Sequence, residues 1–455
     1  MGKLFGTDGI RGVVNAGLDA ELAYKVGLAA AAVLAQEKQG GKPVFTIGKD
    51  TRISSDLLKG ALIAGLCSAG ADVLDLGTIP TPAVAWVTVD RNADAGIVIS
   101  ASHNPFEHNG IKIFNGQGFK LSDALEEKIE EVILNGTNKV PRKTHDQLGK
   151  VYYIAPAAAD DYVDHLISTV QDDLAGLRIL VDCANGAASA TAPALFDRFD
   201  KLQTDCINAD PDGVNINAGC GSTHMESLQA MVKAGSYDLG IAFDGDADRC
   251  LLSDENGVQI DGDQVLAVCG RALRKEGKLP GDTVVATVMS NIGLHAFAQA
   301  EGMQVLCTSV GDRNVLEQMQ AGGYVLGGEQ SGHTIFLEYA TTGDGELTAL
   351  QFLQLLSQSG LKASELVSDC KRYPQELINI AVAGNAEKER IMASDWLAEA
   401  VREQEKRLGE NGRVLVRASG TEALVRVMVE AKEDDMALES AQALVETIKK
   451  HENLE

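Results

Sequence analysis

The chain has 455 residues, of which 45% are hydrophobic and 23% are charged, and its formal net charge is -25. That length exceeds what one hydrophobic core accommodates and predicts about three or four domains. The acidic balance argues against nucleic acid and acidic membrane surfaces as partners. A small anionic substrate is compatible with it where lysine, arginine or a metal reverses the local field.

The cysteines and the N-terminus predict a cytoplasmic protein. Eight cysteines are scattered without a C-x-x-C pair, which favours reduced thiols over a disulfide framework. The first residues show no signal-peptide core. The most apolar early run, residues 26–34, is much shorter than the ~20 residues of a membrane span. We therefore expect no membrane contact.

Up to about residue 360, short β-branched runs alternate with amphipathic stretches, which is typical of parallel sheets covered by helices. The clearest expected strands are 95–100, 179–182, 239–243, 284–288 and 305–310. The last segment differs, because two strands flank a turn and precede an amphipathic helix; the strands are 413–417 and 424–430, and the helix face carries Ala437, Ala441, Leu444 and Ile448.

These patterns predict an α/β protein with three α/β domains, built on mixed or parallel sheets, and a smaller C-terminal α+β domain. The expected domains are 1–153, 154–254, 255–367 and 368–455. Ligands of open α/β sheets bind at the carboxyl ends of the strands, so polar loops at those ends are expected to meet in one central cleft.

The first polar loop, Ser100-Ala101-Ser102-His103-Asn104-Pro105, follows the strand 95–100. Ser102 lacks the flanking glycines of a G-x-S-x-G nucleophile, and a free serine hydroxyl needs a base in order to attack. Ser102 is therefore a candidate phosphoryl carrier, and the alternative is a helix-capping serine. Lys112 is a candidate proton carrier or phosphate contact, against an ordinary surface lysine.

The second loop, Asp244-Gly245-Asp246-Ala247-Asp248-Arg249, concentrates three carboxylates. Alternate residues of an extended segment share one side, where these groups would repel one another without a cation. Oxygen ligands favour a hard ion such as Mg²⁺. An EF-hand is disfavoured, because Arg249 stands where that loop requires glycine; a solvated turn is the other alternative. Arg249 could hold an oxyanion.

The third loop, residues 327–333, places a carboxylate, a hydroxyl and an imidazole on a glycine-rich turn. Glu329 and Ser331 suit neighbouring sugar hydroxyls, and His333 could be a general acid or base. A tight turn with a satisfied histidine is the alternative.

The fourth loop, residues 417–422, joins the two C-terminal strands, and Arg426 follows it. Its hydroxyls, its glycine turn and two arginines resemble an anion nest, with an ordinary β-turn as the alternative. Near the start of the chain, Arg11 stands between glycines that permit close approach to an anion.

Four motifs occur in order along the chain: S-A-S-H-N-P, D-G-D-A-D-R, G-E-Q-S-G-H and R-A-S-G-T-E. In this respect the chain resembles the α-D-phosphohexomutase superfamily over essentially its full length. Three further features resemble the phosphoglucosamine mutase branch: the opening F-G-T-D-G-I-R-G, Gln330, and Asn217-x-x-Cys220-Gly221-Ser222-Thr223-His224.

The resemblance implies four domains around one active-site cleft. It implies a phosphoserine whose phosphate holds Mg²⁺ together with three aspartates: Ser102, Asp244, Asp246 and Asp248. It implies contacts to sugar hydroxyls from Glu329 and Ser331, and a clamp on the non-reacting phosphate made by Arg417, Ser419, Gly420, Thr421 and Arg426. The residues expected near the transferring phosphate or in proton transfer are Arg11, Lys112, Arg249 and His333.

The implied reaction interconverts glucosamine 6-phosphate and glucosamine 1-phosphate through phosphoserine and glucosamine 1,6-bisphosphate, on the route to UDP-N-acetylglucosamine. The alternatives are the same chemistry on glucose or mannose phosphates, a metal-dependent sugar phosphatase, and a non-catalytic sugar-phosphate sensor. The expected partner is a small hexosamine phosphate, and the protein is a monomer or a homodimer. Two residues depart from the family pattern: Ala423 replaces a usual proline, which could loosen the phosphate loop, and Asn314 replaces a usual tyrosine.

Overall fold

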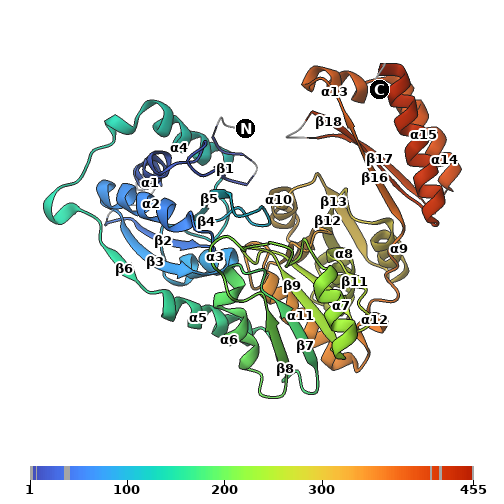
Figure 1. Cartoon of the computed structure of the whole chain (residues 1–455), viewed down its shortest axis with the longest axis horizontal. Coiled ribbons are helices and arrows are strands. Elements are labelled where there is room, and N and C mark those ends of the chain that lie inside the picture. The colour runs from blue at the N-terminus through green and yellow to red at the C-terminus, as the bar shows by residue number, and fades with distance from the viewer. Residues whose placement is uncertain (1–3, 7, 35–40, 410–411, 420–422, 453–455) are drawn as a thin grey trace. The chain divides into compact units, whose positions relative to one another are not determined.

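A computed structural model describes residues 4–6, 8–34, 41–409, 412–419 and 423–452 (Figure 1). The chain forms two compact units, the first made of residues 1–289 and 303–368 and the second of 290–302 and 369–455. Within the described ranges, every helix is too short or too polar to span a lipid bilayer.

The first sheet of the first unit is mixed. Its strands are β1 (Ile10–Val13), β2 (Val44–Lys49), β3 (Asp72–Thr78), β4 (Ala95–Ile99), β5 (His108–Asn115) and β6 (Val151–Tyr153). They lie in the order β1-β5-β4-β2-β3-β6, and β5 runs antiparallel to its neighbours β1 and β4. Every residue of β4 is buried, as expected for an apolar central strand.

Helices cover this first sheet. They are α1 (Ala20–Leu34), α2 (Ser55–Ala69), α3 (Thr81–Asp90) and α4 (Asp123–Asn135). Figure 1 shows α1 and α2 side by side. Their close approach depends on glycine, because a Cβ atom on Gly27 would lie 2.3 Å from Leu62 O and one on Gly65 would lie 2.2 Å from Tyr24 O.

The second sheet has the order β11-β10-β9-β7-β8. Its strands are β7 (Arg178–Asp182), β8 (Gln203–Ile207), β9 (Leu239–Phe243), β10 (Cys250–Asp254) and β11 (Gln259–Ile260). The helices of this region are α5 (Ala155–Ser168), α6 (Ala192–Asp197) and α7 (Glu226–Gly235). Strand β9 is parallel to β7 and antiparallel to β10.

The third sheet has the order β13-β12-β14-β15. Its strands are β12 (Thr283–Thr287), β13 (Gln304–Thr308), β14 (Leu326–Gly328) and β15 (Thr334–Phe336). Its helices are α8 (Gly262–Lys275), α10 (Asp312–Gly322), α11 (Gly345–Ser359) and α12 (Ala363–Leu366). Short 3₁₀ turns of the first unit are η1 (Thr137–Lys139), η2 (His145–Gln147), η3 (Ala187–Ala190) and η4 (Pro280–Asp282).

The second unit is built on an antiparallel sheet with the order β16-β18-β17. Its elements are α9 (Ile292–Ala300), β16 (Gln375–Ala381), α13 (Asn385–Met392), α14 (Asp395–Leu408), β17 (Arg413–Ala418), β18 (Leu424–Glu430) and α15 (Asp434–Glu452). Figure 1 shows α14 and α15 covering one face of this sheet. The predicted apolar face of α15 is buried at Ala437, Ala441, Leu444 and Ile448. The three α/β sheets and the smaller α+β domain confirm the predicted fold class.

One connection recurs in all four sheets. The loops that hold the candidate residues join antiparallel neighbours: β4 to β5, β9 to β10, β14 to β15, and β17 to β18. In the first three hairpins, the first strand also pairs in parallel with another strand of its sheet. Each hairpin returns the chain at the carboxyl end of a strand and leaves its loop at that end.

Candidate active site

Ser102 lies in the loop between β4 and β5, and its side chain faces the second sheet. The residue is 2% exposed and its backbone is left-handed, with φ 51°. Its hydroxyl donates a hydrogen bond to Asp244 Oδ2 at 2.5 Å, across 142 positions of sequence. The structure therefore brings the first two predicted loops into direct contact.

The three aspartates of the second loop form one buried cluster. Asp244, Asp246 and Asp248 each offer an oxygen within 4.8 Å of the others. Burial, followed by the charges of Asp248 and Asp246, raises the pKa of Asp244 well above its ordinary value. Two of the buried oxygens, Asp246 Oδ1 and Asp248 Oδ1, accept no hydrogen bond within the described part of the chain. Oxygen-only donors with free, buried lone pairs fit a hard divalent cation.

Two neighbours orient Asp246. The hydroxyl of Thr81, at the start of α3, donates to Asp246 Oδ2 at 2.7 Å. Lys112 of β5 donates to the same oxygen at 2.9 Å and lies 3.5 Å from both Asp248 Oδ2 and Asp8 Oδ2. Burial lowers the pKa of Lys112, but the three carboxylates outweigh it and raise the pKa overall. Lys112 is thus a buried, charged group within the cluster.

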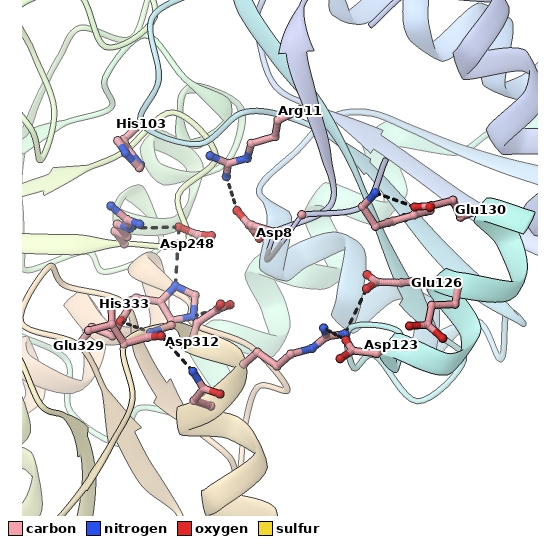
Figure 2. Close-up of a pocket in the computed structure, with 18 residues that line it drawn as sticks. Asp8, Arg11, His103, Asp123, Glu126, Glu130, Asp248, Asp312, Glu329 and His333 are labelled. Atoms are coloured by element: carbon pink, nitrogen blue, oxygen red, sulfur yellow. Dashed lines mark hydrogen bonds and ion pairs between the residues drawn. The ribbon is translucent and has the colours of Figure 1, made fainter. Parts of the chain in front are cut away.

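A pocket of ≈ 450 Å³ opens beside this cluster (Figure 2). It is lined by predicted residues from the second and third loops and from β1, namely Arg11, Asp248, Arg249, Glu329 and His333. The Nε atoms of Arg11 and Arg249 are buried and make no hydrogen bond to any described residue. Such N–H groups suit an incoming oxyanion.

His103 also lines the pocket, with Nδ1 3.4 Å from Ser102 Oγ. Burial, with the charges of Arg249 and Arg11 next in importance, lowers the pKa of His103 to about 4. The imidazole is therefore neutral at physiological pH.

His333 lies between two carboxylates, as Figure 2 shows. Its Nδ1 is 3.8 Å from Asp248 Oδ1 and its Nε2 is 3.7 Å from Asp312 Oδ2. The Gly343 amide donates to Nε2 at 3.1 Å, which places the proton of the neutral ring on Nδ1. Burial lowers the pKa of His333, but the carboxylates of Asp248, Asp312 and Glu329 together raise it by more. The pKa of His333 is therefore raised above its ordinary value.

The two predicted sugar contacts lie differently. Glu329 lines the pocket, and its Oε1 accepts a hydrogen bond from the Gly311 amide at 3.1 Å. Ser331 lies exposed on the same turn, outside the set of residues that line the pocket. Glu329 is thus placed to meet a ligand in this pocket, whereas the contact expected from Ser331 stays a prediction.

The predicted phosphate loop belongs to the second unit. Arg417 of β17 and Arg426 of β18 are directly opposite each other in the antiparallel register. Like charges at such positions are destabilising unless an anion neutralises them. Burial, then the charge of Arg426, lowers the pKa of Arg417. Ser419 is buried and its amide donates to Leu424 O at 2.9 Å, while Gly420 and Thr421 lie outside the described residues.

The sequence reasoning missed Asp8 and Asp312, which line the pocket, and Lys120, which contacts both of them. Lys120 Nζ bridges Asp8 Oδ1 at 2.7 Å and Asp312 Oδ2 at 2.6 Å, which ties the first domain to the third. Asp8 lies in the opening motif and Asp312 in Gly311-Asp312-Arg313, so both stood beside recognisable patterns. No sequence pattern around Lys120 indicates its role, because both of its partners are more than 100 positions away.

Four family models match the chain. They are the phosphoglucomutase/phosphomannomutase alpha/beta/alpha domains I, II and III and the C-terminal domain, over residues 2–140, 160–257, 261–373 and 377–447. Two curated relatives are named phosphoglucosamine mutase. The one from Acetivibrio thermocellus is 53% identical over 449 residues, covering 98% of this chain and 99% of its own. The one from Ruminiclostridium cellulolyticum is 51% identical with the same coverage.

Solved structures share the fold. A phosphoglucomutase/phosphomannomutase family protein from Burkholderia thailandensis matches with a TM-score of 0.82 and 25% identity, over 99% of this chain and 97% of that one. An N-acetylphosphoglucosamine mutase from Aspergillus fumigatus, in complex with GlcNAc-6P and magnesium, matches with a TM-score of 0.65 and 18% identity, over 94% and 96%.

Proposed function

The chain belongs to the phosphoglucosamine mutase family of phosphohexomutases, and we propose on that premise that it interconverts glucosamine 6-phosphate and glucosamine 1-phosphate through a phosphorylated Ser102. The observation that carries the proposal is the contact of 2.5 Å between Ser102 Oγ and Asp244 Oδ2 inside the buried aspartate cluster. A phosphoryl group on that oxygen would lie beside a cation site and at the edge of the pocket.

The cation of this proposal is Mg²⁺, which Asp244, Asp246, Asp248 and an oxygen of the Ser102 phosphate would hold. Its chemistry is to neutralise charge on the phosphoryl oxygens during transfer. The free buried oxygens of Asp246 and Asp248 support this choice, since Mg²⁺ prefers carboxylate ligands and keeps positions for phosphate.

In the first transfer, the free hydroxyl of the sugar phosphate attacks the phosphorus, the bond from phosphorus to Ser102 Oγ breaks, and the 1,6-bisphosphate forms. Arg11 and Arg249, whose Nε–H groups have no hydrogen-bond acceptor among the described residues, stabilise the phosphoryl oxygens. We assign the proton transfers to Lys112 and His333, which flank the aspartate cluster. Lys112, which is charged, would give a proton to the leaving Ser102 oxygen, and the neutral form of His333 would take the proton of the attacking hydroxyl. The bisphosphate then turns over, and its other phosphate returns to Ser102.

Substrate binding is divided between the two units. Glu329, with Ser331, is proposed to hold sugar hydroxyls, and Arg417, Ser419, Gly420, Thr421 and Arg426 to hold the phosphate that does not react. The facing guanidinium groups of Arg417 and Arg426 support this role. Because either end of the bisphosphate must fit, the hydroxyl contacts are expected to be nearly symmetric. The domain limits at 153, 254 and 367 and the cleft that the domains share belong to the same proposal.

The location and assembly belong to the same proposal. We place the enzyme in the cytoplasm, where its eight cysteines would stay reduced as thiols. Its partner is a hexosamine phosphate, and a monomer or a homodimer serves this chemistry equally.

The test is a Ser102→Ala variant together with the intact mass of the purified protein. The wild type is expected to carry phosphate that the variant lacks, and the variant is expected to lose isomerisation while keeping its fold. An active Ser102→Ala variant would contradict the proposal. Comparing kcat/KM on glucosamine, glucose and mannose phosphates tests the substrate, and phosphate release without isomer formation would instead reveal a phosphatase.

A further inference from the structure

The main-chain carbonyl of Ser102 is held by two side chains from distant segments. Arg52 Nη2 donates to it at 2.8 Å, and Asn217 Nδ2 donates to it at 2.9 Å. Ser102 is one of the few non-glycine residues with positive φ, a conformation that needs support from its surroundings. The torsion ψ relates this carbonyl to the Cα–Cβ bond of Ser102, so holding the carbonyl in this backbone conformation fixes the direction of the Cα–Cβ bond and restricts where Oγ can lie.

The Arg52 side chain is itself fully constrained. It is 1% exposed, its Nε pairs with Asp50 Oδ2 at 2.8 Å, and its Nη1 donates to Pro105 O at 2.6 Å. Asp50 Oδ2 also accepts the Ser100 hydroxyl at 2.7 Å, and Ser100 Oγ accepts the Ser102 amide at 2.9 Å. These hydrogen bonds connect the amide and the carbonyl of Ser102 through Ser100, Asp50 and Arg52. Arg52 therefore helps to hold the backbone on both sides of Ser102.

Asn217 reaches the loop from the second domain. It is 6% exposed and left-handed, with φ 58°, and its Nδ2 also donates to Asn104 O at 3.1 Å. Gly245 of the aspartate loop packs against the same place, since a Cβ there would lie 2.6 Å from Ser102 O and 2.8 Å from Asn217 Nδ2. The carbonyl of Ser102 is therefore the point where the serine loop, the aspartate loop and Asn217 meet.

We propose that Asn217 and Arg52 are positioning residues that hold the Ser102 carbonyl and thereby aim Ser102 Oγ at the aspartate cluster. The inference rests on the proposed function and assigns a role to the segment 217–224, which the reaction itself does not use. Phosphoryl transfer depends chiefly on positioning and charge, so a small displacement of the phosphoserine is costly to turnover. A loosened loop also exposes the phosphoserine to water.

The test compares Asn217→Gly with Asn217→Asp. Glycine permits the left-handed backbone and removes the side chain together with its donor, whereas aspartate keeps the size of the side chain and turns an oxygen toward two carbonyl oxygens. The matched control is Asn15→Gly, because Asn15 is exposed and left-handed with φ 63°. Arg52→Lys is the second variant, since it keeps the charge beside Asp50 but loses the forked donors.

For Asn217→Gly we expect kcat to fall by about tenfold to hundredfold while KM changes by less than about threefold. We also expect phosphate on Ser102, followed by intact mass in sugar-free buffer, to be lost at least about threefold faster than in the wild type. Asn217→Asp and Arg52→Lys should likewise lower kcat with little change in KM and lose phosphate faster, and Asn15→Gly should match the wild type.

Two results would overturn the positioning role: Asn217→Gly matching Asn15→Gly in kcat and in phosphoserine lifetime, or a loss carried by KM alone. The proposed function is tested separately, because it fails if Ser102→Ala retains isomerisation or if the wild type releases phosphate without forming the isomer. An inactive Ser102→Ala beside an unaffected Asn217→Gly would reject the inference and leave the reaction standing.

Discussion

The serine–aspartate site and the phosphate loop, which we propose both bind phosphate groups, have two different structural settings. The first is assembled from segments as far apart as Ser102 and Asp244, and each segment is held by buried side chains. The second is a single hairpin on which Arg417 faces Arg426 across neighbouring strands. Transfer chemistry needs fixed geometry between reacting groups, whereas retention of a phosphate needs mainly charge and donors.

The two regions also concentrate opposite charge. Three buried carboxylates repel one another in the first unit, and two guanidinium groups do so in the second. In each case a ligand of opposite charge would relieve this repulsion. The comparison therefore predicts that each region is stabilised by its own ligand, a divalent cation in one and a phosphate in the other.

The largest expected effect comes from Asp244→Asn. Turnover should fall by about 10²-fold to 10³-fold, because one charge of the cation site is lost. The melting temperature without metal should rise or stay equal, since the substitution relieves both the burial of a charge and the repulsion that together raise the pKa of Asp244. The increase on adding MgCl₂ should shrink. Thermal melts with and without MgCl₂ measure this, with the exposed Asp200→Asn as control. A variant stabilised by Mg²⁺ as strongly as the wild type would contradict the assignment of the site.

A smaller effect is expected from Arg417→Gln. KM for both sugar phosphates should rise by about tenfold, the value of one charge-assisted contact. Inorganic phosphate should raise the melting temperature of the wild type more than that of the variant, because the variant has only one of the two arginines that would bind the anion. Steady-state kinetics and melts in phosphate measure both, against the exposed Arg402→Gln. An unchanged KM would show that the phosphate is held elsewhere.

The contrast also explains what the sequence could predict. Strand β9 and the two C-terminal strands lie where alternation and turn residues place them, and the four motifs mark the four loops. The hairpin partners β5, β10 and β15 were not predicted, because an apolar strand after a polar loop has the same pattern whether it runs parallel or antiparallel. The supports were also missed: Arg52 and Lys120 contact residues that are 50 or more positions away, and no local periodicity records such contacts.

The smallest effect is expected at Asp344, a buried carboxyl of the first unit that lies apart from the reacting groups. Asp344 accepts hydrogen bonds from the Tyr162 hydroxyl at 2.8 Å and from the Leu347 amide at 2.9 Å. Burial raises the pKa of Asp344 to about 6, from an ordinary value of 3.8. Between these values the folded protein holds a proton that the unfolded chain releases, so this group makes the folded state less stable as pH rises.

Asp344→Asn removes this titration and keeps an oxygen for the Leu347 amide. When the pH is lowered from 8 to 5.5, the free energy of unfolding of the wild type should increase by about 1 kcal/mol relative to that of the variant. The melting temperature of the variant should therefore fall by about 2 °C relative to that of the wild type. Titrating groups that do not interact with Asp344 are common to both proteins and cancel in the difference. The buried Glu346 does not cancel, because the charge of Asp344 helps to raise its pKa and Asp344→Asn removes that contribution. A difference that stays constant with pH would mean that Asp344 is ionised throughout, and that its hydrogen bonds offset the cost of burying the charge.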